Sequence, residues 1–213
     1  KIMALKGEIH LQTRIQSLRA DSHKILLSTP NQNIEFDRVI VAVAPQHVAH
    51  ICAKIPELTN VCHTVAAYRY EVIATVYLQY PPDIRLSRPM LSLGGGPAQF
   101  VFDRGYTHSQ PGLIVCVISA ASALLGHPQS EWIRQIQQQL SHIFAPALPL
   151  WHKAIVEKQA TYVCGPHMAK PENQTTHPLV FLAGDYTAGP YPATLESATD
   201  SGVKSAQLLL NTL

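Results

Sequence analysis

The sequence predicts an α/β protein that combines an α+β domain built on a mixed sheet with a C-terminal strand and helix. Three segments carry this prediction. The run Val39–Val43 is apolar and β-branched, as in a strand covered on both faces. From Ala67 to Tyr80 large and apolar residues recur at every second position, which indicates a long strand. Finally, the apolar stretch Leu179–Ala183 runs into a glycine-rich turn and a long helical pattern from Ala193 to Leu210.

The N-terminal part is predicted to consist of short strands and one helix. Thr29-Pro30-Asn31 marks a turn among the strands, and Pro45 opens a helix through Ile51 because proline is favoured in a first helical turn. The strand candidates before Val39 are Glu8–Gln12, Ile15–Leu18, Lys24–Ser28 and Ile34–Phe36.

The central part is predicted to be a sheet with one amphipathic helix. Pro81-Pro82 ends the long strand, since proline cannot donate to a ladder. Pro128 opens the helix, whose apolar face is predicted to hold Trp132, Ile136, Leu140 and Ile143. The further strand candidates are Gln99–Asp103, Leu113–Ser119 and Lys153–Val163.

Composition excludes several classes of protein. Of 213 residues, 46% are hydrophobic and 14% charged, with a net charge of +2, so neither disorder nor charge-driven nucleic-acid binding is expected. The apolar run Leu113–Leu125 is too short to span a bilayer. The four cysteines lie far apart without a C-x-x-C pair, which favours a reducing, cytoplasmic compartment. Because the chain starts at Lys1, we expect an internal start.

The segment after Leu179 holds the clearest chemical signal. Gly184-Asp185 follows an apolar strand, and a helix begins beside Pro192 and Thr194, so helix N–H groups are presented near the end of the strand. Ala198, Gly202 and Ala206 are predicted to give the helix a flat face. Two interpretations stand side by side: an ordinary strand–loop–helix crossover, or a site for a polar ring or anion with Asp185 as hydrogen-bond acceptor.

Two blocks, Leu182–Thr187 and Tyr191–Glu196, resemble the C-terminal FAD motif of the flavin amine oxidase and phytoene desaturase superfamily. The resemblance implies FAD as cofactor and a Rossmann-like FAD domain to which the last strand and helix belong. It places Asp185 at the ribityl or pyrophosphate region and the backbone of the helix start at the flavin pyrimidine ring. The FAD-binding residues implied in this motif are Gly184, Asp185, Tyr186, Tyr191, Pro192, Ala193, Thr194 and Leu195.

Further blocks, among them Gly96–Gly105 and Glu157–Tyr162, are similar to the squalene-associated FAD-dependent desaturases, the hydroxysqualene dehydroxylases of hopanoid biosynthesis. Ile15 matches a position whose backbone meets the adenine, and Ala44 would lie near the ADP half. The resemblance implies a β-rich remnant of the FAD domain in residues 1–44, a substrate domain in 45–177 and the FAD motif in 178–213.

Two departures from the superfamily pattern matter. Asp200 stands where an arginine is usual, and no G-x-G-x-x-G fingerprint follows a strand, since Gly94–Gly96 has neither the spacing nor a following helix. That fingerprint holds the pyrophosphate. We therefore expect the chain to correspond to the C-terminal half of an enzyme, and these 213 residues alone to bind no flavin and to be inactive.

The implied function is FAD-dependent conversion of hydroxysqualene to squalene, an apolar isoprenoid held by burial and shape. The alternatives are a carotenoid-type desaturase and a non-catalytic apolar-ligand or interaction module. Peripheral contact with the inner membrane and a homodimer through exposed apolar faces are further expectations, and no nucleic-acid partner is expected. No catalytic residue is identified, and no metal site is predicted, because His47 and His50 have no third ligand nearby.

Overall fold

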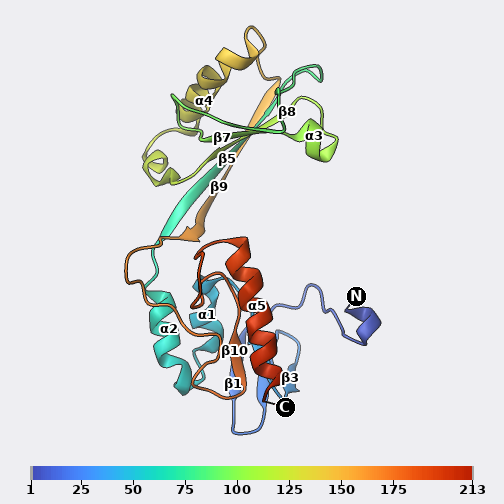
Figure 1. Cartoon of the computed structure of the whole chain (residues 1–213), viewed down its shortest axis with the longest axis vertical. Helices are drawn as coiled ribbons and strands as arrows, with labels where there is room; N and C mark the ends of the chain where they lie inside the picture. Colours follow the sequence, from blue (N-terminus) through green and yellow to red (C-terminus); the bar gives the residue numbers. More distant parts are fainter. Residues whose placement is uncertain (1, 213) are drawn as a thin grey trace. The chain divides into compact units, whose positions relative to one another are not determined.

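The protein, a computed structural model that describes residues 2–212, folds into two compact units (Figure 1). The terminal unit comprises Lys1–Tyr68 and Cys164–Leu213, and the central unit comprises Arg69–Val163. The sequence prediction placed its boundaries after residues 44 and 177 instead. Residues 45–68 and 164–177 fold with the terminal unit, because α1 packs against β1, α2 packs against α1, and Asn173 binds Leu182 of β10. The roles assigned to the predicted segments stay predictions.

The terminal unit contains two small sheets. An antiparallel sheet has the order β1 (Ser17–Ala20), β2 (Ile25–Ser28), β3 (Asn33–Phe36), and β4 (Val39–Val41) pairs in parallel with β10 (Val180–Leu182). The strand predicted at Val39 is present, and its pairing with β10 is parallel. The helical elements of this unit are η1 (Met3–Leu5), α1 (Pro45–Cys52), η2 (Pro56–Leu58), α2 (Thr59–Ala66) and α5 (Leu195–Leu210).

One predicted strand of this unit, Glu8–Gln12, is wrong. Its alternating pattern would need a neighbouring strand, and the segment pairs with none among residues 2–212. Ile9 and Leu11 are accordingly exposed. Helix α2 was not predicted, because four of its eight residues are β-branched and its helical signal is therefore weak.

The central unit is a five-stranded sheet in the order β6-β7-β8-β5-β9, and all its pairings are antiparallel. The fold class is α/β, as predicted. The sheet of this unit was expected to be mixed, and it is antiparallel throughout. Figure 1 shows the long pair β5 and β9 running through the unit, with α4 beside the sheet. The elements are β5 (Tyr70–Gln79), β6 (Met90–Ser92), β7 (Phe100–Asp103), α3 (Arg104–His108), β8 (Leu113–Ile118), η3 (Ala121–Gly126), α4 (Gln129–Phe144) and β9 (Trp151–Tyr162).

The core of the central unit lies between one face of this sheet and α4. Alternate residues of β5 are buried there because successive strand side chains point to opposite faces. Trp132, Ile136 and Leu140 pack against them as predicted, whereas Ile143 is 41% exposed and Phe144 is buried in its place. The described helices include none that has both the length and the apolar character needed to cross a bilayer.

The glycine loop Gly94–Gly96 is held by a buried amide. Gln139 of α4 accepts a hydrogen bond from the Ala98 N–H at 3.2 Å and donates to the carbonyl oxygens of Gly94 and Ala98 at 2.9 and 2.8 Å. A Cβ on Gly96 would lie 2.6 Å from the Gln139 side chain. The loop therefore needs glycine to pack against α4.

Candidate functional site

The parallel pair β4 and β10 brings two predicted site segments to one edge of a sheet. The Ala183 N–H donates to the Val41 carbonyl at 3.0 Å, so both strands end at the same level. Ala44 therefore leaves the sheet beside Gly184. In open α/β sheets the carboxyl ends of the strands are where ligands bind.

Ile15 lines a cavity of about 450 Å³ in the terminal unit. Val43, at the end of the β4 segment, lines the same cavity, together with His47 and His50 of α1. Ile15 and the end of the β4 segment were both predicted to lie near the ADP half of the cofactor. The cavity places Ile15 beside Val43, the residue before the predicted Ala44, and Ala44 does not line it.

The ring of Tyr186 leaves no room for a Cβ at position 184. A Cβ at this position would lie 2.4 Å from Cε1 and 2.7 Å from Cδ1 of Tyr186, whose ring is fully buried. Close approach of a cofactor is therefore not needed to explain this glycine. Tyr186 is a core residue, and burial raises the pKa of its hydroxyl well above the usual range.

Asp185 lies half-buried between these two residues. Burial raises the pKa of its carboxyl, and a hydrogen bond to its own backbone partly offsets this rise. Its carbonyl oxygen lies 3.5 Å from the Ala193 nitrogen, which donates to it. This contact ties the Gly184-Asp185 turn to the residues just before α5.

The start of α5 is open to a ligand. Thr194 is the N-cap, and its hydroxyl accepts from the Ser197 N–H at 3.2 Å, so the helix begins at Leu195 rather than at the predicted Ala193. The first N–H groups of a helix have no partner within it. Leu195 is 88% exposed and Tyr191 is 65% exposed, whereas Pro192 and Ala193 are half-buried.

The face of α5 that packs inward differs from the predicted one. Ser197, Ser201 and Ser205 are buried at i, i+4 and i+8, while Ala198, Gly202 and Ala206 are only half-buried. The serine spacing is visible in the sequence, but the serines are satisfied only by partners that the fold supplies. Asn173, the central partner, was missed because no motif marks it.

Asp103 and Arg104, which stand together at the junction of β7 and α3, bind different partners. Asp103 is fully buried and accepts from the Arg85 Nε at 2.8 Å and from the Leu86 N–H at 3.1 Å. It also accepts from the Gly105 N–H at 2.8 Å and so caps α3. Arg104 binds the Gln110 side chain instead. The position is structural.

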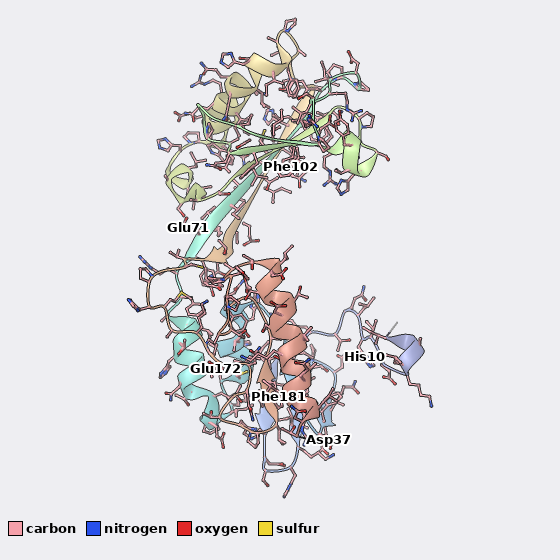
Figure 2. All side chains as sticks on the ribbon, viewed as in Figure 1. His10, Asp37, Glu71, Phe102, Glu172 and Phe181 are labelled. Atoms are coloured by element: carbon pink, nitrogen blue, oxygen red, sulfur yellow. The ribbon has the colours of Figure 1, made fainter. Side chains whose placement is uncertain are left out.

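On the side of the sheet away from α4 the central unit carries a mostly apolar face, on which Lys153 and Glu157 of β9 stand opposite Tyr77 and Ile73. Strand register places Thr75 and Tyr77 of β5 beside Val117 and Val115 of β8, and these beside Phe100 and Phe102 of β7. Figure 2 labels Phe102 on this sheet. The face is uncovered at its sides, since Phe100 is 39% exposed and Ile155 and Trp151 of β9 are 49% and 47% exposed.

Comparison with known proteins agrees with this geometry. The family model described as flavin containing amine oxidoreductase matches residues 2–210. The chain belongs to this family. The fold fits as well: an oxidoreductase from Methanosarcina mazei superposes with a TM-score of 0.73 at 17% identity, over 97% of this chain and 51% of that one.

Two curated relatives show which kinds of flavoenzyme the chain is similar to. A hydroxysqualene dehydroxylase of Sinorhizobium fredii is 27% identical over 179 residues, which is 82% of this chain and 39% of the relative. A zeta-carotene desaturase of Capsicum annuum is 30% identical over 102 residues, 46% of this chain and 17% of the relative. The chain thus spans less than half the length of either relative.

The residues present fit the flavin that the family name implies. A half-buried carboxylate at Asp185 is a suitable acceptor for ligand hydroxyls, and the main-chain carbonyl of the same residue accepts from the Ala193 N–H just before α5. These groups meet at the end of β10, the place where the fold presents backbone donors. Asp200, which departs from the superfamily pattern, is exposed one turn further along α5.

Proposed function

We propose that the complete protein is an FAD-dependent oxidoreductase that converts hydroxysqualene to squalene. The observation that carries the flavin part is the junction of Asp185 with the first turn of α5 in a chain of the flavin amine oxidoreductase family. Bound reduced FAD would supply a hydride to the carbon that loses its hydroxyl, which departs with a proton as water.

The chain's own residues have two tasks at the cofactor. Asp185 accepts hydrogen bonds from hydroxyls of the ribityl or pyrophosphate region. The N–H groups of the first turn of α5 would bind the flavin pyrimidine ring and would stabilise the negative charge of the reduced form. Ile15 and Ala44 contribute backbone near the adenine and the ADP half.

The substrate part of the proposal rests on the apolar sheet face of the central unit. Squalene has no charged group, so a protein must hold it by burial of apolar surface. A mostly apolar sheet face with exposed large side chains such as Phe100 and Ile155 is typical of a binding surface or an interface. Strands β5, β7 and β8 form the centre of this face.

A carotenoid-type desaturase is the second candidate, supported by the similarity to the zeta-carotene desaturase. It would use the same apolar face for a polyene and run the redox step in the opposite direction. A non-catalytic module for apolar ligands, which would keep the face without using flavin, is the third.

The test uses the complete gene product, purified and analysed for flavin by absorbance and then given hydroxysqualene with a reductant. We expect one FAD per chain and formation of squalene. Bound flavin with desaturation of a carotene instead would select the second candidate, and a protein that takes up no FAD would leave only the third.

A variant pair tests the substrate surface separately. Phe100→Glu places a charge on the partly exposed apolar face and should raise KM for the isoprenoid at least about 5-fold, because a carboxylate must be desolvated against it. Gln138→Glu adds the same charge on the exposed side of α4 and should change neither KM nor flavin content. Equal KM values for both variants would contradict a substrate site on this face.

A further inference from the structure

A buried polar network joins α5 to the turn that carries Asp185. Its members are the side chains of Asn173, Thr187, Ser201 and Ser205, each no more than 5% exposed. The hydrogen bonds among these side chains constrain their geometry, and of the network's polar atoms only the Asn173 Oδ1 lacks a partner among the described residues. The network lies within the terminal unit and uses residues from three segments of the chain.

Ser201 contacts both ends of the turn. Its Oγ accepts from the Gly184 N–H at 3.0 Å and lies 2.7 Å from the Thr187 Oγ1. The Thr187 hydroxyl in turn donates to the Gly184 carbonyl at 3.1 Å. The Ser201 hydroxyl therefore donates to Thr187, and the turn that presents Asp185 is closed on both sides.

Asn173 seats Ser201 in this position. Its Nδ2 donates to the Ser201 Oγ at 2.7 Å and to the Leu182 carbonyl of β10 at 3.0 Å. The Leu182 N–H donates to the Asn173 carbonyl at 2.8 Å. The amide thereby fixes the strand end, the helix and the turn against one another.

The position of Ser201 on α5 links the network to the start of the helix. The same helix carries Ser201 in its second turn and the open N–H groups in its first, about 9 Å away along the axis. The bond from Ser201 to Gly184 therefore sets where Asp185 lies relative to the helix start. Those are the two groups that the proposed function assigns to opposite parts of one flavin.

We infer that Ser201, seated by Asn173, is a positioning residue that sets the spacing between the Asp185 carboxylate and the first turn of α5 and so determines flavin affinity. The inference rests on the proposed function as far as flavin is concerned. The positioning of the turn itself does not depend on the cofactor.

Ser205 offers a matched control. It lies one turn further along the same buried face and is fully buried. Its hydroxyl donates to the Leu182 carbonyl and lies 3.0 Å from the Asn173 Nδ2, whose two hydrogens serve Ser201 and Leu182, and it contacts no residue of the Gly184–Thr187 turn. Ser201→Ala and Ser205→Ala each remove one buried hydroxyl, and only the first releases the turn.

The experiment compares Ser201→Ala, Ser205→Ala and Ser201→Thr in the complete gene product. Flavin dissociation is measured by fluorescence, global stability by urea unfolding, and protection of the Gly184 and Asp185 amides by hydrogen exchange. We expect Ser201→Ala to raise the Kd for FAD roughly 10-fold, in proportion to the loss of a buried hydrogen bond. Ser205→Ala should change Kd less than about 3-fold at a similar loss of stability, and Ser201→Thr should restore affinity.

Hydrogen exchange separates failure of this inference from failure of the proposed function. Ser201→Ala should accelerate exchange at Gly184 beyond the effect of Ser205→Ala, with or without flavin. If the unsubstituted protein binds no FAD, the proposed function and the flavin part of the inference fall, while the exchange result still decides the positioning of the turn. Equal effects of the two alanine variants on Kd and on exchange would overturn the inference and reduce Ser201 to a structural residue.

Discussion

Two strand-to-helix junctions carry an aspartate: Asp103 lies between β7 and α3, and Asp185 lies between β10 and α5. The two carboxylates differ in their burial and in their hydrogen-bond partners. At the first, the carboxylate is fully buried and both oxygens accept from groups of the central unit, including the Arg85 guanidinium. At the second, the carboxylate is half-buried, and burial rather than a cation dominates its pKa.

The difference between the junctions lies in what compensates the buried charge. Burying a carboxylate is costly unless a cation or several hydrogen bonds compensate it, and Asp103 has both. Asp103 therefore stabilises its fold and is closed to ligands. The pKa of Asp185 is raised, and its turn is held by the hydrogen bonds of Gly184 and Thr187. A carboxylate with a shifted pKa in a rigid turn is typical of a group that faces a ligand.

The largest expected effect comes from Asp103→Asn. The amide cannot accept on both sides, so the Leu86 or the Gly105 N–H loses its acceptor and the pair with Arg85 is lost. The free energy of unfolding of the central unit should fall by about 2–4 kcal/mol. Urea unfolding followed by tryptophan fluorescence measures this, because both tryptophans, Trp132 and Trp151, lie in the central unit.

Asp83→Asn is the control for this prediction, because Asp83 is exposed in the loop that precedes Arg85. It should leave the unfolding midpoint unchanged. A similar midpoint for both variants would mean that the Asp103 junction is not closed in the way its contacts indicate.

A smaller loss is expected for Gly184→Ala at the other junction. The added Cβ would meet the Tyr186 ring at 2.4 Å, and the buried ring has little room to move, so we expect a loss of about 1–3 kcal/mol. Thermal unfolding by far-UV circular dichroism measures it. Gly189→Ala is the control, since no atom lies within 4 Å of its Cβ position. If Gly184→Ala is as stable as the parent, the glycine is kept for a ligand rather than for the ring.

The smallest effect is a pH dependence at Asp185. The pKa is raised in the folded state, so the folded protein holds this proton more tightly than the unfolded chain, and the carboxylate reduces stability as pH rises from about 4. Asp185→Asn removes this penalty. The variant should match the parent in stability at pH 4 and exceed it at pH 7, by less than about 1 kcal/mol because the group is partly solvated.

Urea unfolding at a series of pH values tests this, with Asp200→Asn as a control for the loss of one negative charge. If Asp185→Asn became less stable than the parent as pH rises, the Asp185 carboxylate would be compensated like that of Asp103. The contrast between the two junctions would then disappear.

The sequence by itself determined the element types with strong periodicity and the chemical signature of the last segment. The long strand ending at Gln79, the amphipathic helix from Gln129 and the strand–glycine–helix unit near Gly184 follow local rules of alternation, helical spacing and turn chemistry. These rules depend only on neighbours in the chain, so they can be applied without the fold.

Only the tertiary structure decided which polar groups are bound by partners within the fold and which are left to face a ligand. Asp103 and Asp185 look alike in the sequence, because each follows an apolar strand and precedes a helix. Arg85 lies 18 residues from Asp103, and Asn173 lies 28 residues from Ser201. The energy of a buried charge or hydroxyl depends on partners that only the packed chain brings within hydrogen-bonding distance, and those partners separate a structural aspartate from one that faces a ligand.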